Sequence, residues 1–146
     1  QEREEQRMSS WIMHTDGACS GNPGPSGIGV WATDDEGATA LELSEFIGPG
    51  TNNWAEYRAI VRGLEEAVAA GVDHLEVFCD SQVVVRQING EYACRCPHLG
   101  AERLAIVSLI GEFSRFNISH IYDDGNRRAD RLAKNAARRG YNPKQM

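Results

Sequence analysis

The sequence predicts an α/β fold in which a mixed five-stranded sheet is flanked by helices. Three strand-like segments come first and are joined by short turns, which predicts an antiparallel meander. Strand-like and helix-like segments then alternate, an order typical of strands that join a sheet in parallel through helical crossovers. The chain of 146 residues has the length of one domain, which we expect to span residues 10–141.

The antiparallel part is predicted from three segments in the first third of the chain. Residues 11–16 form a largely apolar run that ends in a carboxylate, and a loop crowded with glycine and proline follows. Residues 28–33 predict the second strand, and the acidic turn at 34–37 predicts a hairpin. The alternation of residues 38–47 then predicts the third strand.

The middle of the chain predicts a helix, a short strand and a second helix. Residues 52–70 are bounded by polar capping residues and a glycine, which are ordinary helix start and stop signals. Residues 74–80 predict a strand that ends in a carboxylate. The next segment, up to Ile88, is rich in β-branched residues, but the cap that Ser81 offers favours a helix.

The last third predicts an irregular segment at 92–99, a helix at 100–116, a strand at 117–122, a turn at 123–125 and a helix at 126–139. In the first of these helices we expect the core to be met by Leu104, Val107, Leu109 or Ile110, and Phe113. In the last helix the inward positions are expected to be Ala129, Leu132 or Ala133, and Ala136 or Ala137.

Composition places the chain among water-soluble globular domains, with 41% hydrophobic and 25% charged residues and no apolar run of the roughly 18 residues that a membrane span needs. Residues 1–9 are expected to be a disordered lead-in or tag, and residues 142–146 a tail. The 4 cysteines are too few and too irregularly spaced for a disulfide framework. We therefore expect a monomer in the reducing cytoplasm, with no membrane partner.

The charge distribution bears on possible ligands. A net charge of −6 argues against binding nucleic acid through an overall positive field. Metal ions held among acidic groups would reverse the potential locally. Positive charge is also concentrated near the C-terminus, in Arg127, Arg128, Arg131, Lys134, Arg138 and Arg139.

Four acidic residues stand where the predicted elements would bring them together. Asp16 and Asp80 end strands that the topology makes central and parallel, and sites in open α/β sheets are built at that edge. Glu56 begins the apolar stripe of its helix, and Asp130 lies beside the stripe of the last helix.

Each of these residues also has an ordinary structural explanation when it is taken alone. An Asp-Gly pair after a strand is a turn signal, which accounts for Asp16, and Asp80 can cap the next helix. Glu56 and Asp130 lie in the first turns of helices, where the macrodipole favours negative charge. Convergence of all four would be repulsive without a cation, and hard oxygen ligands favour Mg²⁺ or Mn²⁺.

The chain resembles type 1 ribonuclease H over roughly residues 10–139. Any one of the matching motifs would be a weak signal, but all occur in the family's order. They are Thr15-Asp16-Gly17-Ala18-Cys19 with its Gly-Pro loop, Thr51-Asn52-Asn53-Trp54-Ala55-Glu56, Cys79-Asp80-Ser81-Gln82, and Asn126-Arg127-Arg128-Ala129-Asp130. The resemblance implies the ribonuclease H-like form of the mixed sheet described above.

The resemblance also implies an activity, namely endonucleolytic hydrolysis of the RNA strand of RNA/DNA hybrids to 5′-phosphate and 3′-hydroxyl ends. Catalysis would use two Mg²⁺ ions, one to generate the attacking hydroxide and one to stabilise the leaving oxygen, with Mn²⁺ as a substitute. In this family pattern Asp16 bridges the ions, Glu56 and Asp80 complete one site, and Asp130 completes the other.

Six further positions match family residues that contact the hybrid, whose single RNA strand is distinguished by its 2′-hydroxyls. Cys19, Asn22, Asn52, Asn53 and Gln82 match positions near the minor groove, and Thr51 matches one that grips a phosphate of the DNA strand.

The sequence departs from the family pattern at two places. The basic protrusion that many members carry is absent, since residues 87–92 lead directly to Pro97 with no lysine run, so the chain resembles the handle-less branch. The loop before the last helix is Asp123-Asp124-Gly125 where many members have a histidine. Its two carboxylates could attract another metal ion, but an Asx turn is the preferred interpretation. His120 is expected to be a structural residue of the last strand.

Two alternatives belong to other functional classes. One is a hybrid-binding module without catalysis, which would have been free to lose its carboxylates. The other is a different nuclease of the same superfold, since fold alone does not determine function.

Overall fold

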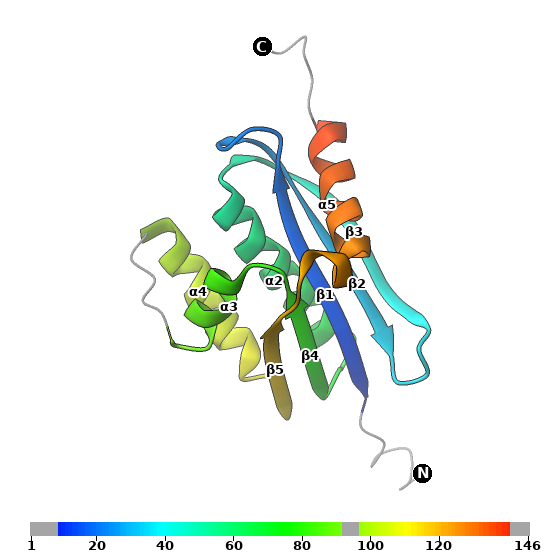
Figure 1. The fold of residues 1–146 in the computed structure, drawn as a ribbon. Helices are drawn as coiled ribbons and strands as arrows, with labels where there is room; N and C mark the ends of the chain where they lie inside the picture. The colour runs from blue at the N-terminus through cyan, green and yellow to red at the C-terminus, as the bar shows by residue number, and fades with distance from the viewer. Residues whose placement is uncertain (1–8, 92–96, 141–146) are drawn as a thin grey trace, which may run out of the picture.

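Five strands form one mixed sheet in the order β3-β2-β1-β4-β5 (Figure 1). They are β1 (Ser10–Cys19), β2 (Gly24–Asp34), β3 (Thr39–Gly50), β4 (His74–Cys79) and β5 (Arg115–His120). The first three strands pair antiparallel, whereas β4 joins β1 in parallel and β5 joins β4 in parallel. The predicted fold class is therefore confirmed.

The computed structural model describes residues 9–91 and 97–140. The predicted lead-in up to residue 8, the irregular segment at 92–96 with Cys94 and Cys96, and the tail at 142–146 lie outside the described residues. None of the helices within the described ranges is long and apolar enough to cross a membrane.

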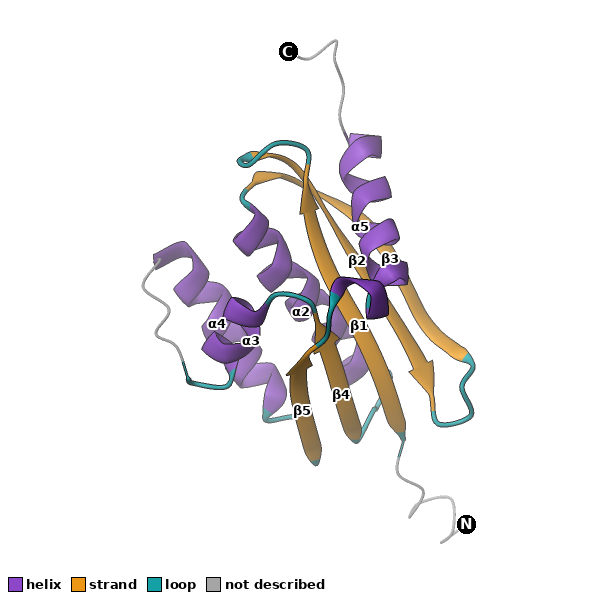
Figure 2. Ribbon diagram, viewed as in Figure 1, coloured by secondary structure: helices purple, strands orange, loops and turns teal. Residues whose placement is uncertain are grey.

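Helices cover both faces of the sheet (Figure 2). One face is covered by α2 (Asn52–Ala69), together with α3 (Gln82–Ile88) and α4 (Pro97–Ile110). The other face carries α5 (Arg127–Gly140), which crosses β1, β2 and β3 and leaves β4 and β5 open. A single turn of 3₁₀ helix, η1 (Asp123–Gly125), leads into α5.

The main core lies between the sheet and α2. Tyr57, Ile60 and Leu64 of α2 are fully buried, and they pack with Met13 and Val77 from the central strands. Full burial of side chains of this size stabilises a fold by roughly 1.5–3 kcal/mol each. As predicted, the helix begins after Thr51, whose hydroxyl accepts a hydrogen bond from Trp54 N at 3.2 Å.

The α4 region differs from its prediction. The helix begins at Pro97 and ends at Ile110, so the segment predicted to continue it to residue 116 instead turns into β5. Proline is compatible with the first position of a helix, where its missing N–H has no partner to lose.

The predicted inner face of α4 is wrong at two positions and confirmed at the others. Phe113, just beyond the helix, is buried in the core, and Leu109 and Ile110 pack against it. Leu104 is 68% exposed and Val107 49% exposed, while Ile106 is fully buried. Apolar residues surround this helix on nearly every side, so their spacing could not identify the face that meets the core.

Candidate active site

The two strand-borne carboxylates lie next to each other at the centre of the sheet. β1 and β4 pair in parallel with Thr15 opposite Cys79, so Asp16 and Asp80 follow at adjacent positions. β1 then continues to Cys19 while β4 has ended, which places Asp16 inside a strand and not at its end. Asp16 is only 4% exposed, so its carboxyl group lies in a largely water-excluded position.

The helix-borne carboxylates arrive from opposite faces by the same local arrangement. A β-carbon added at Gly17 would lie 2.4 Å from the carbonyl carbon of Ala55, and one added at Gly29 would lie 2.2 Å from the carbonyl oxygen of Ala129. Helix α2 therefore touches the backbone of β1, and α5 touches that of β2. The carboxylates of α2 and α5 directly follow these two alanines.

An open cavity of about 550 Å³ collects these groups. Three of the predicted carboxylates line it, and Glu56 lies behind them with 7% exposure. The acidic and basic side chains in the lining are Asp16, Asp80, Asp123, Asp124, Arg127, Asp130 and Lys134.

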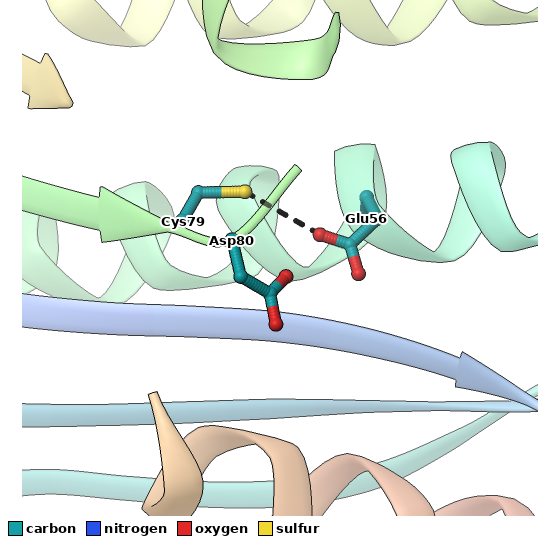
Figure 3. A group of neighbouring side chains, drawn as sticks. All are labelled: Glu56, Cys79 and Asp80. Atoms are coloured by element: carbon teal, nitrogen blue, oxygen red, sulfur yellow. Dashed lines mark hydrogen bonds between the residues drawn. The ribbon is translucent and has the colours of Figure 1, made fainter. Parts of the chain in front are cut away.

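One backbone amide orients two of the carboxylates. The N–H of Gly17 donates to Asp16 Oδ1 at 2.9 Å and to Glu56 Oε1 at 2.8 Å. On the other side of Glu56, the thiol of Cys79 donates to Oε2 at 3.4 Å (Figure 3). Both oxygens of Glu56 are thus held before any ligand arrives.

Burial and mutual repulsion disfavour ionisation in this cluster. Burial, followed by contact with Glu56, raises the pKa of Asp16 to about 12. Burial raises the pKa of Glu56, and burial together with the charge of Asp123 raises the pKa of Asp80. A divalent cation would relieve this repulsion, and the oxygen donors of the cluster are the kind that hard cations such as Mg²⁺ and Mn²⁺ prefer.

Cys79 is part of the cluster, although no role was predicted for it. Its sulfur and one carboxylate oxygen each from Glu56 and Asp80 lie within 4.8 Å of one another (Figure 3). Burial raises the pKa of the Cys79 thiol, so it stays protonated and donates to Glu56. Strand alternation could have placed it, since Leu75 and Val77 of β4 are buried on the same face.

Asn126 is a second residue that had no predicted role. It is 1% exposed, and its side-chain amide donates to the carbonyl oxygen of Thr15 at 2.9 Å. This bond ties the residue before α5 to the residue before Asp16. The side chain of Asn126 also forms a hydrogen bond with Asp80, and this bond favours the ionised form of that carboxylate.

The loop at 123–125 forms the one turn of 3₁₀ helix before α5. Backbone bonds from Gly125 N to Tyr122 O and from Asn126 N to Asp123 O close it. A turn was the preferred prediction, but backbone groups close it where an Asx bond was expected. Both Asp side chains line the cavity.

The six predicted substrate residues fall into three groups. Cys19 and Asn52 line the cavity beside the carboxylates. Asn22 instead accepts a hydrogen bond from Asn52 N at 3.0 Å, which joins the β1–β2 loop to the start of α2. Thr51 caps the same helix.

The remaining two predicted substrate residues, Asn53 and Gln82, are exposed in the first turns of α2 and α3. Neither lines the cavity.

Comparison with known proteins agrees with this geometry. Residues 14–136 match the family described as "Reverse transcriptase-like". Ribonuclease HI of Halobacterium salinarum is 38% identical over 83% of this chain and 61% of its own length. Ribonuclease H of Syntrophus aciditrophicus is 36% identical over 88% of this chain and 80% of its own. "Bifunctional protein Rv2228c" of Mycobacterium tuberculosis is 38% identical, and the chain spans only 35% of its length.

Solved structures extend the agreement to the fold. RNase H1 from Halobacterium salinarum superposes with a TM-score of 0.86 at 35% identity, covering 90% of this chain and 99% of that one. LC11-RNase H1 in complex with an RNA/DNA hybrid gives a TM-score of 0.83 at 40% identity, covering 88% and 97%.

The sheet order and the carboxylate cluster beside its two central parallel strands define the ribonuclease H-like class of folds. Within that class, the identity and coverage above settle the family: the chain belongs to the type 1 ribonucleases H and is homologous to ribonuclease H enzymes. The resemblance drawn from the sequence motifs is confirmed.

Proposed function

We propose that this protein is an endonuclease that hydrolyses the RNA strand of RNA/DNA hybrids and leaves 5′-phosphate and 3′-hydroxyl ends. The observation that carries the proposal is that Asp16, Asp80 and Asp130 line one open cavity and the carboxylate of Glu56 lies behind them, in contact with Asp16. A relative that is 40% identical has a structure in complex with an RNA/DNA hybrid, which supports this choice of substrate.

The four carboxylates would hold the divalent ions, with Mg²⁺ as the proposed metal and Mn²⁺ as a substitute. When bound, two such ions supply a hydroxide nucleophile at neutral pH and neutralise charge on the leaving oxygen. The raised pKa of Asp16 and Glu56 means that protons compete with the metal for the same oxygens.

The chain's own residues do the positioning. Gly17 N–H and the Cys79 thiol hold Glu56, so its carboxylate needs little rearrangement when a cation is bound. Cys19 and Asn52 line the same cavity, where they would meet the sugar edge of the strand under attack. Thr51, Asn22, Asn53 and Gln82 are proposed to contact the hybrid from the flanking loop and helix starts.

The deciding experiment compares labelled RNA/DNA, RNA/RNA and DNA/DNA duplexes of one sequence in Mg²⁺. We expect cleavage of the RNA strand of the hybrid, with a 3′-hydroxyl that a polymerase can extend. Asp80→Asn removes a metal ligand at nearly constant volume and should abolish cleavage without loss of the folded state. Wild-type activity in that variant would contradict the assigned role.

The same assay separates the alternatives. A hybrid-binding module would bind the labelled hybrid without cutting it, and another nuclease of this superfold would cut DNA/DNA or RNA/RNA instead.

A monomer in the cytoplasm is also proposed, on the evidence of the sequence alone.

A further inference from the structure

The outer surface of α5 carries a row of cations that the catalytic proposal does not use. Arg127, Arg131, Lys134 and Arg138, which we call the basic stripe, are spaced i, i+4, i+7 and i+11 and are all exposed. That spacing places them in one line along the helix, opposite the buried alanines, over roughly 16 Å.

The three arginines of the stripe differ from the other arginines of α5 because they form no ion pair with the part of the protein that the structure describes. Arg128 pairs with Glu42 and lies 4.8 Å from the ring of Trp31, and Arg139 donates to Ser44 O at 2.8 Å. These two residues fasten α5 to the sheet. Within the described ranges, Arg127, Arg131 and Arg138 form no ion pair, and Lys134 pairs only with Asp130.

Helix stability does not account for the stripe. A cation in the last turn of a helix is favoured by the macrodipole, which would explain Arg138. Arg127 opens the helix, where the same dipole opposes a positive charge, and Arg131 lies in the middle. A row of arginines that lack acidic partners among the described residues is also unexpected in a chain whose net charge is −6.

The stripe leads out of the active site along a continuous surface. A second cavity of about 230 Å³ lies beside the first, between the β1–β2 loop and α5. The two cavities have Ala18, Cys19 and Lys134 in common, and Arg138 lines the far side of the second. A strand seated over the carboxylates would therefore meet Lys134 and then Arg138 as it leaves.

We propose that the basic stripe binds consecutive phosphates of the RNA strand on one side of the cleaved bond, with the second cavity as the first of these subsites. Guanidinium groups without protein partners can bind phosphate oxygens through paired hydrogen bonds. The assignment to the RNA strand rests on the proposed function, because the strand over the carboxylates is the one cut. In a chain without a basic protrusion, α5 would then supply the backbone contacts.

The test measures hybrid affinity against salt concentration for Arg131→Gln, Arg138→Gln and the double variant. Arg115→Gln is the matched control, because Arg115 is exposed at the start of β5, opposite His74 and far from the acidic end of the sheet. A fluorescent RNA/DNA hybrid is titrated in Ca²⁺ in place of Mg²⁺, and the slope of log K against log salt is compared.

Each phosphate contact that is lost lowers the magnitude of this slope by about 0.7–0.9. We expect that change for each stripe variant, twice that change for the double variant, and no change for Arg115→Gln. An unchanged slope in the double variant, or an equal change in the control, would overturn the proposal. Both arginines are exposed, so the melting temperature should stay at the wild-type value.

A second measurement locates the contacts. Two hybrids are compared, each extended on only one side of the cleavage site, and the double variant should lose affinity for one of them only. Equal losses for both would overturn the path along the second cavity. Single-turnover cleavage in Mg²⁺ at saturating hybrid should match the wild type. If the wild-type protein cuts no hybrid, the proposed function fails, whereas the slopes still decide whether α5 binds phosphates.

Discussion

Helices α2 and α5 deliver one carboxylate each from opposite faces of the sheet, and they do so through the same contact. Gly17 and Gly29 have no side chain, so the strand backbone at each position lies against an alanine of a helix. The residue after that alanine is the carboxylate, Glu56 in α2 and Asp130 in α5. Away from this contact the helices differ. Tyr57, Ile60 and Leu64 of α2 fill a core, whereas α5 rests on the sheet mainly through alanines.

This difference indicates what the site requires of its scaffold. The position of each carboxylate depends on backbone contact at one turn, and the remainder of the helix is free to serve another purpose. In α2 the remainder stabilises the core. In α5 the outward-facing side of the remainder carries the exposed basic stripe. Burial follows the same division, because Glu56 is 7% exposed while the Asp130 side chain is 38% exposed.

The largest expected effect is one in which the two helices behave alike. Glu56→Gln and Asp130→Asn each remove a metal ligand, so each should lower single-turnover cleavage of a hybrid about a thousandfold, equivalent to roughly 4 kcal/mol. Glu76→Gln, on the exposed surface of β4, is the control and should cleave normally. If only one of the two helix variants lost activity, the carboxylates would not act as one site.

A smaller effect should separate the two helices. A β-carbon at Gly29 would meet the backbone oxygen of Ala129, whereas one at Gly63 of α2 would meet the flexible Met13 side chain, with Sδ at 2.6 Å. Gly29→Ala should lower the free energy of unfolding by about 3 kcal/mol. Gly63→Ala should change it by no more than about 1 kcal/mol, because Met13 can move and alanine favours a helix. Urea denaturation measures both, and equal costs would contradict the distinction.

The third expected effect is a gain in stability that depends on pH, in the Glu56→Gln variant of the metal-free protein. Because burial raises the pKa of Glu56, the folded state binds its proton more tightly than the unfolded state, and ionisation lowers stability as pH rises above about 4.3. Glu56→Gln removes that cost, so in EDTA it should be more stable than wild type at pH 7 and equal to it near pH 4. Asp130→Asn should gain less, since Asp130 is partly exposed and pairs with Lys134 at 3.1 Å.

Unfolding curves in urea at the two pH values check this expectation, and added Mg²⁺ should narrow the difference at pH 7. A Glu56→Gln protein that is less stable than wild type at pH 7 would mean that the hydrogen bonds from Gly17 and Cys79 outweigh the cost of burying the charge of Glu56.

The sequence was sufficient to predict the strands, α2 and the convergence of the four carboxylates, because these depend on strand order and on local signals such as alternation, caps and Asp-Gly turns. The metal-binding role of the carboxylates stays a prediction. Their exact surroundings depend on contacts between distant segments. The thiol of Cys79 meets Glu56 only because β4 packs against α2, and Asn126 meets Thr15 from 111 residues away. Leu104 and Val107 of α4 were wrongly assigned to the core because a helix with apolar residues all round carries no directional signal.

The smallest expected effect concerns η1, which belongs to neither helix. Asp123 and Asp124 line the cavity, but their turn is closed by backbone bonds and both residues are exposed. Changing both to Asn should therefore leave the fold intact and keep the cleavage rate at pH 8 within about twofold of wild type.

After burial, the charge of Asp123 is the main influence that raises the pKa of Asp80. Its removal should move the acid limb of the pH–rate profile to lower pH. Asp34→Asn with Asp35→Asn, at the end of β2 and the start of the turn that follows it, is the matched control for the loss of two charges. A large loss of rate that excess Mg²⁺ restores would instead identify the η1 carboxylates as ligands of a further ion, and the acidic site would then extend beyond the carboxylates of the two helices and strands.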